Sequence, residues 1–123
     1  NIAIRHINAQ EFVFFTKGDN VAGINEVLQY ILANEDTRRL KIVNVLKKGE
    51  NIPIGLKNDI QVLDRAYPSI VIELVEEPGV FGPEKIHELS ERWKIPVNFM
   101  FIGSPGDKFP YKLDELGEVR LII

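Results

Sequence analysis

Short apolar runs alternate along this chain with longer stretches of mixed polarity. The runs are rich in Val, Ile and Phe, and Gly, Pro, Asp or Asn residues bound them. Such runs are typical of buried β-strands, because β-branched and aromatic side chains pack well on a pleated surface. The sequence therefore predicts strands at residues 11–16, 40–46, 69–75 and 97–102, and a short last strand at 119–123.

Between the runs, apolar residues recur every three or four positions. This spacing places them on one face of an α-helix, and it predicts helices near residues 20–34, 54–67 and 83–94. Asp19 or Asn20 can cap the first helix, while Pro53 and Pro83 suit helix starts. A further helical turn is expected at residues 113–116.

Alternating strands and helices favour an α/β fold with three layers. We expect a mainly parallel sheet of 4–5 strands with helices on both faces. Residues 11–123 show no internal repeat or linker and form a single α/β domain, whereas residues 1–10 resemble a connector.

Two loops are the candidate ligand or partner sites. In an open α/β sheet, ligands bind beyond the carboxyl ends of the strands, where the strand order reverses. If the strand order is 3-2-1-4-5, that point lies between the first and fourth strands, and the first loop leads into a helix N-terminus that suits an anion. The alternative is that Gly, Ser and Pro are present only because turns require them. The candidate residues are Thr16, Lys17, Gly18, Asp19, Asn20, Gly103, Ser104, Pro105, Gly106 and Asp107.

Composition narrows the function classes. Of the 123 residues, 45% are hydrophobic and 27% are charged, as in ordinary globular domains. The net charge of −3 disfavours nucleic acid as a partner. The absence of cysteine excludes disulfides and thiolate chemistry, and no apolar run reaches the ~18 residues that span a bilayer.

Catalytic and metal-binding patterns are weak. Glu76 and Glu77 could reach a metal ion together with Glu73 or Asp107, but a charge pair in a loop is more simply solvated. His87 is expected at a wet helix surface, and Trp93 in the core. Since no acid–base pair or nucleophile stands out, we expect no enzyme, no metal and no cofactor.

Gly103-Ser104-Pro105-Gly106 follows a strand with the spacing G-x-x-G, which resembles the universal stress protein family. Members that bind ATP carry a later glycine followed by Ser or Thr. Here Leu116 occupies the glycine position, and Gly117 comes one residue late and precedes Glu118. Phe14-Phe15-Thr16 also lacks the acidic residue that the family places at the end of its first strand. The resemblance therefore implies the fold, with a free-standing nucleotide-binding protein as the alternative function.

A second resemblance covers almost the whole chain. Residues 93–110, WKIPVNFMFIGSPGDKFP, are similar to the cytoplasmic C-terminal extension of bacterial permeases of the amino acid–polyamine–organocation superfamily. The closing ELGEVRLI at 115–122 and the stretches at 11–18 and 59–64 are similar to it as well.

This second resemblance implies an accessory or regulatory domain at the cytoplasmic face of the cell membrane. Its partners would be the membrane-embedded part of the same transporter chain and, through an edge strand at 119–123, a second copy in a homodimer. A chain that begins at Asn1, with Met100 as its one methionine, fits the expectation of a piece of a longer protein.

Overall fold

All strands of the sheet run parallel. In this computed structural model we describe residues 11–16, 21–34, 38–103 and 119–122. The elements are β1 (Phe12–Phe15), α2 (Val21–Asn34), β2 (Arg39–Leu46), α3 (Ile54–Ala66), β3 (Val71–Pro78), α4 (Pro83–Trp93), a 3₁₀ turn (Val97–Phe99), β4 (Met100–Gly103) and β5 (Arg120–Ile122).

The five strands lie in the order β3-β2-β1-β4-β5, as the sequence predicts. Phe14 of β1 is in register with Ile42 on one side and with Phe101 on the other. Because every pair is parallel, all carboxyl ends meet at one edge of the sheet. The strand order reverses between β1 and β4, so this edge is where the fold favours a ligand.

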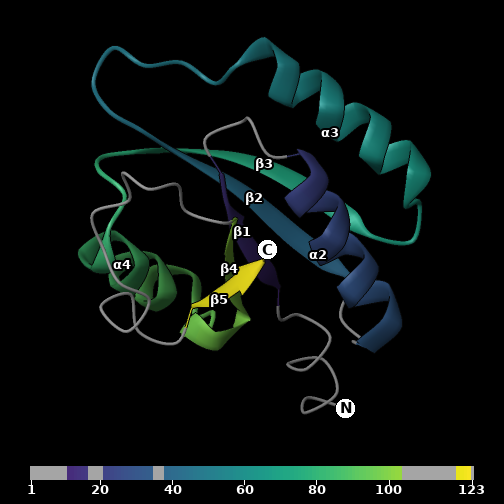
Figure 1. The fold of residues 1–123 in the computed structure, drawn as a ribbon. Coiled ribbons are helices and arrows are strands. Elements are labelled where there is room, and N and C mark those ends of the chain that lie inside the picture. The colour runs from purple at the N-terminus through teal and green to yellow at the C-terminus, as the bar shows by residue number, and fades with distance from the viewer. Residues whose placement is uncertain (1–10, 17–20, 35–37, 104–118, 123) are drawn as a thin grey trace.

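Helices cover both faces of the sheet, which confirms the three-layer architecture. Figure 1 shows α2 and α3 on one side of the strands and α4 on the other. The core beneath α2 and α3 is built on Phe12, Phe14, Leu40 and Ile42. Alternate strand residues face opposite sides, so Val13, Phe15 and Val43 pack beneath α4.

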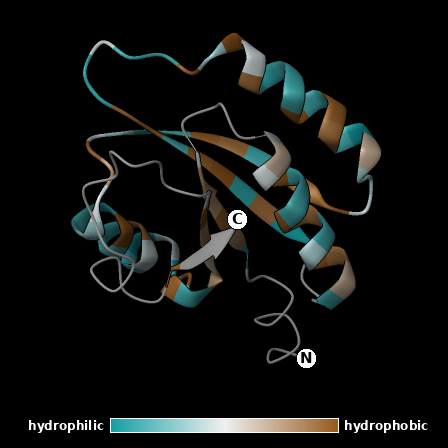
Figure 2. Cartoon of the chain, viewed as in Figure 1, coloured by the Kyte–Doolittle hydropathy of each residue, from teal (hydrophilic) through white to brown (hydrophobic). Residues whose placement is uncertain are grey.

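The helices form where the apolar spacing predicts them. In α3 the buried residues are Leu56, Ile60 and Leu63, which share one face of the helix. Figure 2 shows hydrophobic and hydrophilic residues alternating along this helix. Among the described residues, no helix is both long enough and apolar enough to cross a membrane.

Two strand boundaries differ by three residues from the sequence prediction, and the others by at most two. The fourth strand begins at Met100 rather than Val97, because Val97–Phe99 form a 3₁₀ turn after Pro96. In this turn the Phe99 N–H donates to the Pro96 carbonyl at 2.9 Å. The third strand continues past residue 75 to Pro78, since β2 pairs with it that far. The expected turn at 113–116 and the connector at 1–10 lie outside the described residues.

Helix α4 ends in a defined cap. Lys94 takes the left-handed conformation, with φ of 58°, and the Ser90 hydroxyl donates to the Ile95 carbonyl at 2.6 Å. The Ile95 N–H returns to the Ser90 carbonyl at 3.1 Å. These bonds satisfy backbone groups that a helix terminus leaves unpaired. They also direct the chain from α4 toward β4.

Candidate functional site

The two sequence-predicted loops begin at neighbouring strand ends. Phe15 is in register with Ile102, so Thr16 and Gly103, the next residues, lie side by side at the carboxyl edge. The strands that precede the two loops, β1 and β4, are therefore neighbours in the sheet. The remaining candidates lie outside the described residues: Lys17, Gly18, Asp19, Asn20, Ser104, Pro105, Gly106 and Asp107.

A row of polar residues crosses the sheet at this edge. Asn44 of β2 is in register with Glu76 of β3. Thr16 follows Phe15 in the ladder, and its N–H donates to the Val43 carbonyl at 3.0 Å, which places it beside Asn44. By strand alternation all three lie on the side of α2 and α3. The row thus borders the main core at the end where ligands bind in this class of fold.

Asn44 is the unusual member of the row. Its exposed fraction is 3%, yet its amide Nδ2 has no hydrogen-bond partner within the described structure. Leaving a buried amide donor unpaired costs about 1–3 kcal/mol. Ordered water is the usual partner of a buried amide of this kind.

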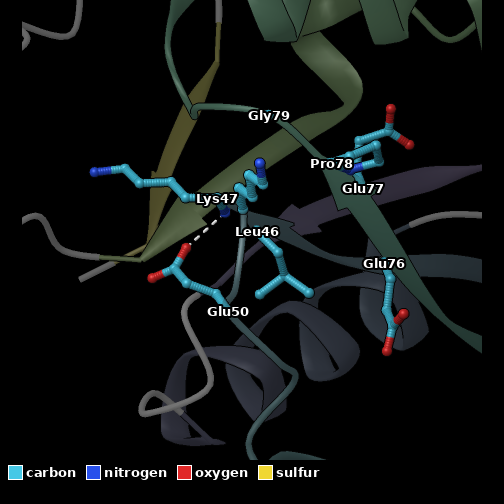
Figure 3. Close-up of a pocket in the computed structure, with 8 residues that line it drawn as sticks. Leu46, Lys47, Glu50, Glu76, Glu77, Pro78 and Gly79 are labelled. Carbon is cyan, nitrogen blue, oxygen red and sulfur yellow. Dashed lines mark hydrogen bonds between the residues drawn. The ribbon is translucent and has the colours of Figure 1, made fainter.

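An open hollow of about 570 Å³ lies at the ends of β2 and β3, and Asn44 is not among the residues that line it. Leu46 and Glu76, which line it, are the next residue of β2 on the same face and the register partner of Asn44. Figure 3 shows the Leu46 and Glu76 side chains pointing to one side of the strands and the Glu77 carboxylate to the other. The full lining is Leu46, Lys47, Lys48, Glu50, Glu76, Glu77, Pro78 and Gly79.

Two glycine turns shape the hollow. After β2, the Glu50 N–H donates to the Lys47 carbonyl at 3.0 Å, and Gly49 has a φ of +88°, as a type II turn requires. The Glu50 carboxylate also accepts from the Lys47 N–H at 2.6 Å, as Figure 3 shows. After β3, the Gly79 N–H donates to the Leu46 carbonyl at 2.9 Å, and its φ is +131°. Hydrogen bonds thus hold both rims in place.

The hollow carries groups of both charges that are free to interact. Lys48 and Glu76 make no ion pair or side-chain hydrogen bond with the rest of the described chain, and the Lys47 amine makes none either. Leu46 and Pro78 add apolar surface. These groups make the hollow polar and of mixed charge, but it is open to solvent and does not enclose a ligand.

Glu77 belongs to an ion cluster on the opposite side of β3. Its Oε1 accepts from Lys85 Nζ at 3.1 Å and from Arg92 Nη2 at 2.5 Å. Burial opposes ionisation, but the hydrogen bonds from Arg92 and Lys85 and their charges outweigh it, so the pKa of Glu77 lies below its usual value. The same hydrogen bond raises the pKa of Arg92. The cluster therefore fastens α4 to the end of β3.

This arrangement corrects the interpretation of the acidic pair. Glu76 and Glu77 are in strand β3 rather than a loop, and Glu77 is buried and paired rather than solvated. The two carboxylates lie on opposite faces, and Glu73 bonds Lys41 at 2.5 Å. In the described part of the chain, no group of three or more His, Asp or Glu residues is arranged to hold a metal ion.

Trp93 is less deeply placed than the sequence predicts. It is partly buried and packs against the core beneath α4. Lys41 Nζ and the Arg92 guanidinium carbon lie 5.4 Å and 5.6 Å from its ring, within the range of cation–π contacts. His87 is exposed and pairs with Glu91 at 3.1 Å, so it is the surface residue that was expected.

Sequence reasoning missed Asn44 and most of the hollow. One signal was available, because Asn44 interrupts an otherwise apolar strand and a polar residue there needs an explanation. No comparable signal marks the hollow itself, since its two rims are separated by helix α3 and lie together only through the pairing of β2 with β3.

The fold is a three-layer α/β domain whose hollow lies at the carboxyl ends of β2 and β3, whereas the strand order reverses between β1 and β4. In comparisons with protein-family models, with curated proteins and with solved structures, nothing matches the chain.

Proposed function

We propose that this chain is a non-catalytic regulatory domain of an amino-acid permease. It would lie at the cytoplasmic face of the cell membrane, attached to the membrane-embedded part of the same protein. The resemblance of residues 93–110 to the C-terminal extension of such permeases supports this proposal. The type of site supports it too, because the edge offers hydrogen-bonding groups for binding and no acid–base pair among its described residues.

The unpaired amide of Asn44 is the observation that carries the proposal. This buried polar group at the carboxyl edge of the sheet is the position at which we propose that a partner binds. A domain whose stability changes when such a partner binds can bias the transporter to which it is attached. Regulation of this kind requires that the partner binds two conformational states of the full protein with different affinities. It requires no chemical step.

Two measurements test the proposal. The reading frame upstream of Asn1 should encode several apolar segments of ~20 residues, which are the spans of the transporter. Amino-acid uptake by the full protein in proteoliposomes should then change about fivefold or more when residues 11–123 are deleted, as typical allosteric couplings require. A start codon directly before Asn1, or identical uptake with and without the domain, would contradict the proposal.

The membrane part of the chain would be one partner and a second copy of the domain another. β5 is the last strand at one side of the described sheet, and unpaired edge groups favour pairing between copies. Sedimentation equilibrium should detect a homodimer whose fraction rises with concentration. A monomer at every concentration up to the solubility limit would exclude this partner.

The alternative is a free-standing nucleotide-binding protein of the universal stress type. The strand order and the position of Gly103 beside Thr16 favour it, because the G-x-x-G motif of that family follows the same strand. Titration of the chain with Mg-ATP distinguishes the two functions, and tight binding would favour the alternative.

A further inference from the structure

The geometry points to a second copy of this chain that pairs with the free edge of β3, so that two sheets join into one across a two-fold axis. This inference goes beyond the proposed function and does not require a transporter. It concerns the edge of the sheet opposite β5. β3 is the outermost strand on its side of the described sheet, and its eight residues exceed the three of β5.

The edge of β3 presents its backbone groups in a fixed alternation. At the two ends of the strand, the N–H groups of Val71 and Gly79 donate to carbonyls on the β2 side, at 2.8 Å and 2.9 Å. Successive residues of a strand direct their N–H and C=O groups to opposite sides. The backbone groups of Ile72, Leu74 and Glu76 therefore point away from β2, and β3 pairs with no other strand of the described sheet.

Apolar side chains and a proline distinguish this edge. Val71 is 56% exposed, while Ile72, Leu74 and Val75 are half-buried. Pro78 occupies an outward position, where a sheet tolerates proline because no N–H is needed for the ladder. A long edge strand with accessible apolar side chains is a template for pairing with another chain.

Symmetry and hydrogen bonding limit how two such edges can pair. Identical edges in a closed dimer meet around a two-fold axis, so we take the two strands as antiparallel. Bonded residues in an antiparallel ladder exchange both N–H···O bonds, so an outward residue must face an outward residue. Registers near the middle of β3 that satisfy this condition have the axis at Glu73, Leu74 or Val75.

The carboxylates of β3 favour the axis at Leu74. An axis at Glu73 places that carboxylate opposite its own copy, and an axis at Val75 places it opposite Glu77 of the second copy. Like charges directly opposite each other in a sheet are destabilising. With the axis at Leu74, Glu73 faces Val75 of the second copy, and no carboxylate of the strand faces another.

The Leu74 register also uses every outward N–H of the strand. Leu74 bonds its own copy across the axis, and Ile72 exchanges bonds with Glu76 of the second copy. Next along the ladder, Pro78 faces Ile70 of the second copy. Proline has no N–H, and the Ile70 N–H already donates within its own chain at 3.0 Å. The pairing therefore ends where no donor is left over.

Sedimentation equilibrium of the purified chain tests the inference, with a dimer expected at a dissociation constant below about 1 mM. Glu76→Pro removes an outward N–H from each chain and keeps the ladder with β2, because that N–H does not point toward β2. The dissociation constant should rise about tenfold or more. Glu76→Ala is the matched control, since it keeps the N–H and should leave the dimer intact.

Leu74→Cys supplies the second measurement, which decides the question should Glu76→Pro not fold. The chain has no other cysteine. Bonded residues in an antiparallel pair have Cα atoms about 5.5 Å apart, within reach of a disulfide. Mild oxidation should therefore link two Leu74→Cys chains. Val80→Cys is the control, since Val80 is 62% exposed but lies beyond the end of β3, and it should cross-link far more slowly.

Four results would overturn the inference: a wild-type chain that is monomeric at about 1 mM; a dimer that Glu76→Pro leaves unchanged; equal weakening by Glu76→Pro and Glu76→Ala; or cross-linking of Val80→Cys as fast as that of Leu74→Cys. A dimer that Glu76→Pro leaves unchanged would assign the contact to β5 instead. These results remain distinct from failure of the proposed function, because uptake with and without the domain is measured independently.

Discussion

Replacing Glu77 by Gln tests how strongly the ion cluster fastens α4 to the sheet. Glu77 accepts hydrogen bonds from Lys85 and Arg92, and its side chain is 8% exposed. Removing one partner of a buried ion pair costs about 3–5 kcal/mol. Here the cost is lower for two reasons. The Arg92 side chain is 48% exposed, so water can solvate its charge, and Lys85 Nζ still pairs with the Glu88 carboxylate at 3.3 Å. We expect a loss of about 2 kcal/mol at pH 7.

Thermal and urea unfolding measure this loss. For a domain of this length, about 2 kcal/mol lowers the melting temperature by about 8 °C. Glu88→Gln is the control. The Glu88 side chain is 52% exposed, so its removal should cost less than about 0.5 kcal/mol.

The pH dependence gives a second readout. The pKa of Glu77 is lowered on folding, so its contribution is fully present above the unfolded pKa, near 4.5, and is lost as the pH falls through the folded pKa. The difference between Glu77→Gln and wild type should stay constant from pH 7 to about pH 5.5 and shrink below 4.5. A loss under about 0.5 kcal/mol at pH 7, or a difference that does not change with acid, would refute the reasoning.

Three other predictions concern the turns, the α4 cap and nucleotides. Gly79→Ala should cost about 1–2 kcal/mol in urea unfolding, because φ is +131° and the new Cβ would meet Lys85 Cε at 3.1 Å. Gly55→Ala in α3, where a Cβ meets nothing within 4 Å, should instead stabilise the chain. Ser90→Ala should cost about 0.5–1.5 kcal/mol by removing the bond to the Ile95 carbonyl, and an unchanged unfolding midpoint would contradict this. Mg-ATP should bind with a dissociation constant in the millimolar range or weaker, since Gly117 comes one residue later than the glycine of the stress-protein motif and Glu118 would repel phosphate. A calorimetric dissociation constant of about 10 μM or below would contradict this and favour the stress-protein alternative.

Local patterns predict the helices well, and the resemblance to stress-protein-like domains implies the strand order. Leu56, Ile60 and Leu63 share the face that the structure buries, because helical periodicity depends only on nearby residues. The order β3-β2-β1-β4-β5 is the one that stress-protein-like domains share, whereas the alternation of elements predicts only a mainly parallel sheet. Both predictions are confirmed.

Features that depend on distant partners are not visible in the sequence. Glu76 to Pro78 look like a loop by composition, yet they form strand because Asn44 to Leu46 pair with them. Val97 to Phe99 look like a strand, yet β4 begins only at Met100, where pairing with Val13 starts. The hollow is missed for the same reason, since it forms between segments that meet only in the folded sheet.

The central position of β1 has a consequence for synthesis on the ribosome. Its apolar residues Phe12–Phe15 pair with β2 on one side, but their other neighbour, β4, follows three helices and two further strands. At a synthesis rate of about 5–20 residues per second, that edge of β1 stays unpaired for on the order of ten seconds before β4 is made. During that interval the nascent chain exposes an unpaired, hydrophobic strand edge, and such an edge can pair with other chains and cause aggregation. Chains truncated before Met100 should therefore accumulate in inclusion bodies, and a chaperone that shields Phe12–Phe15 would raise the yield of the complete fold.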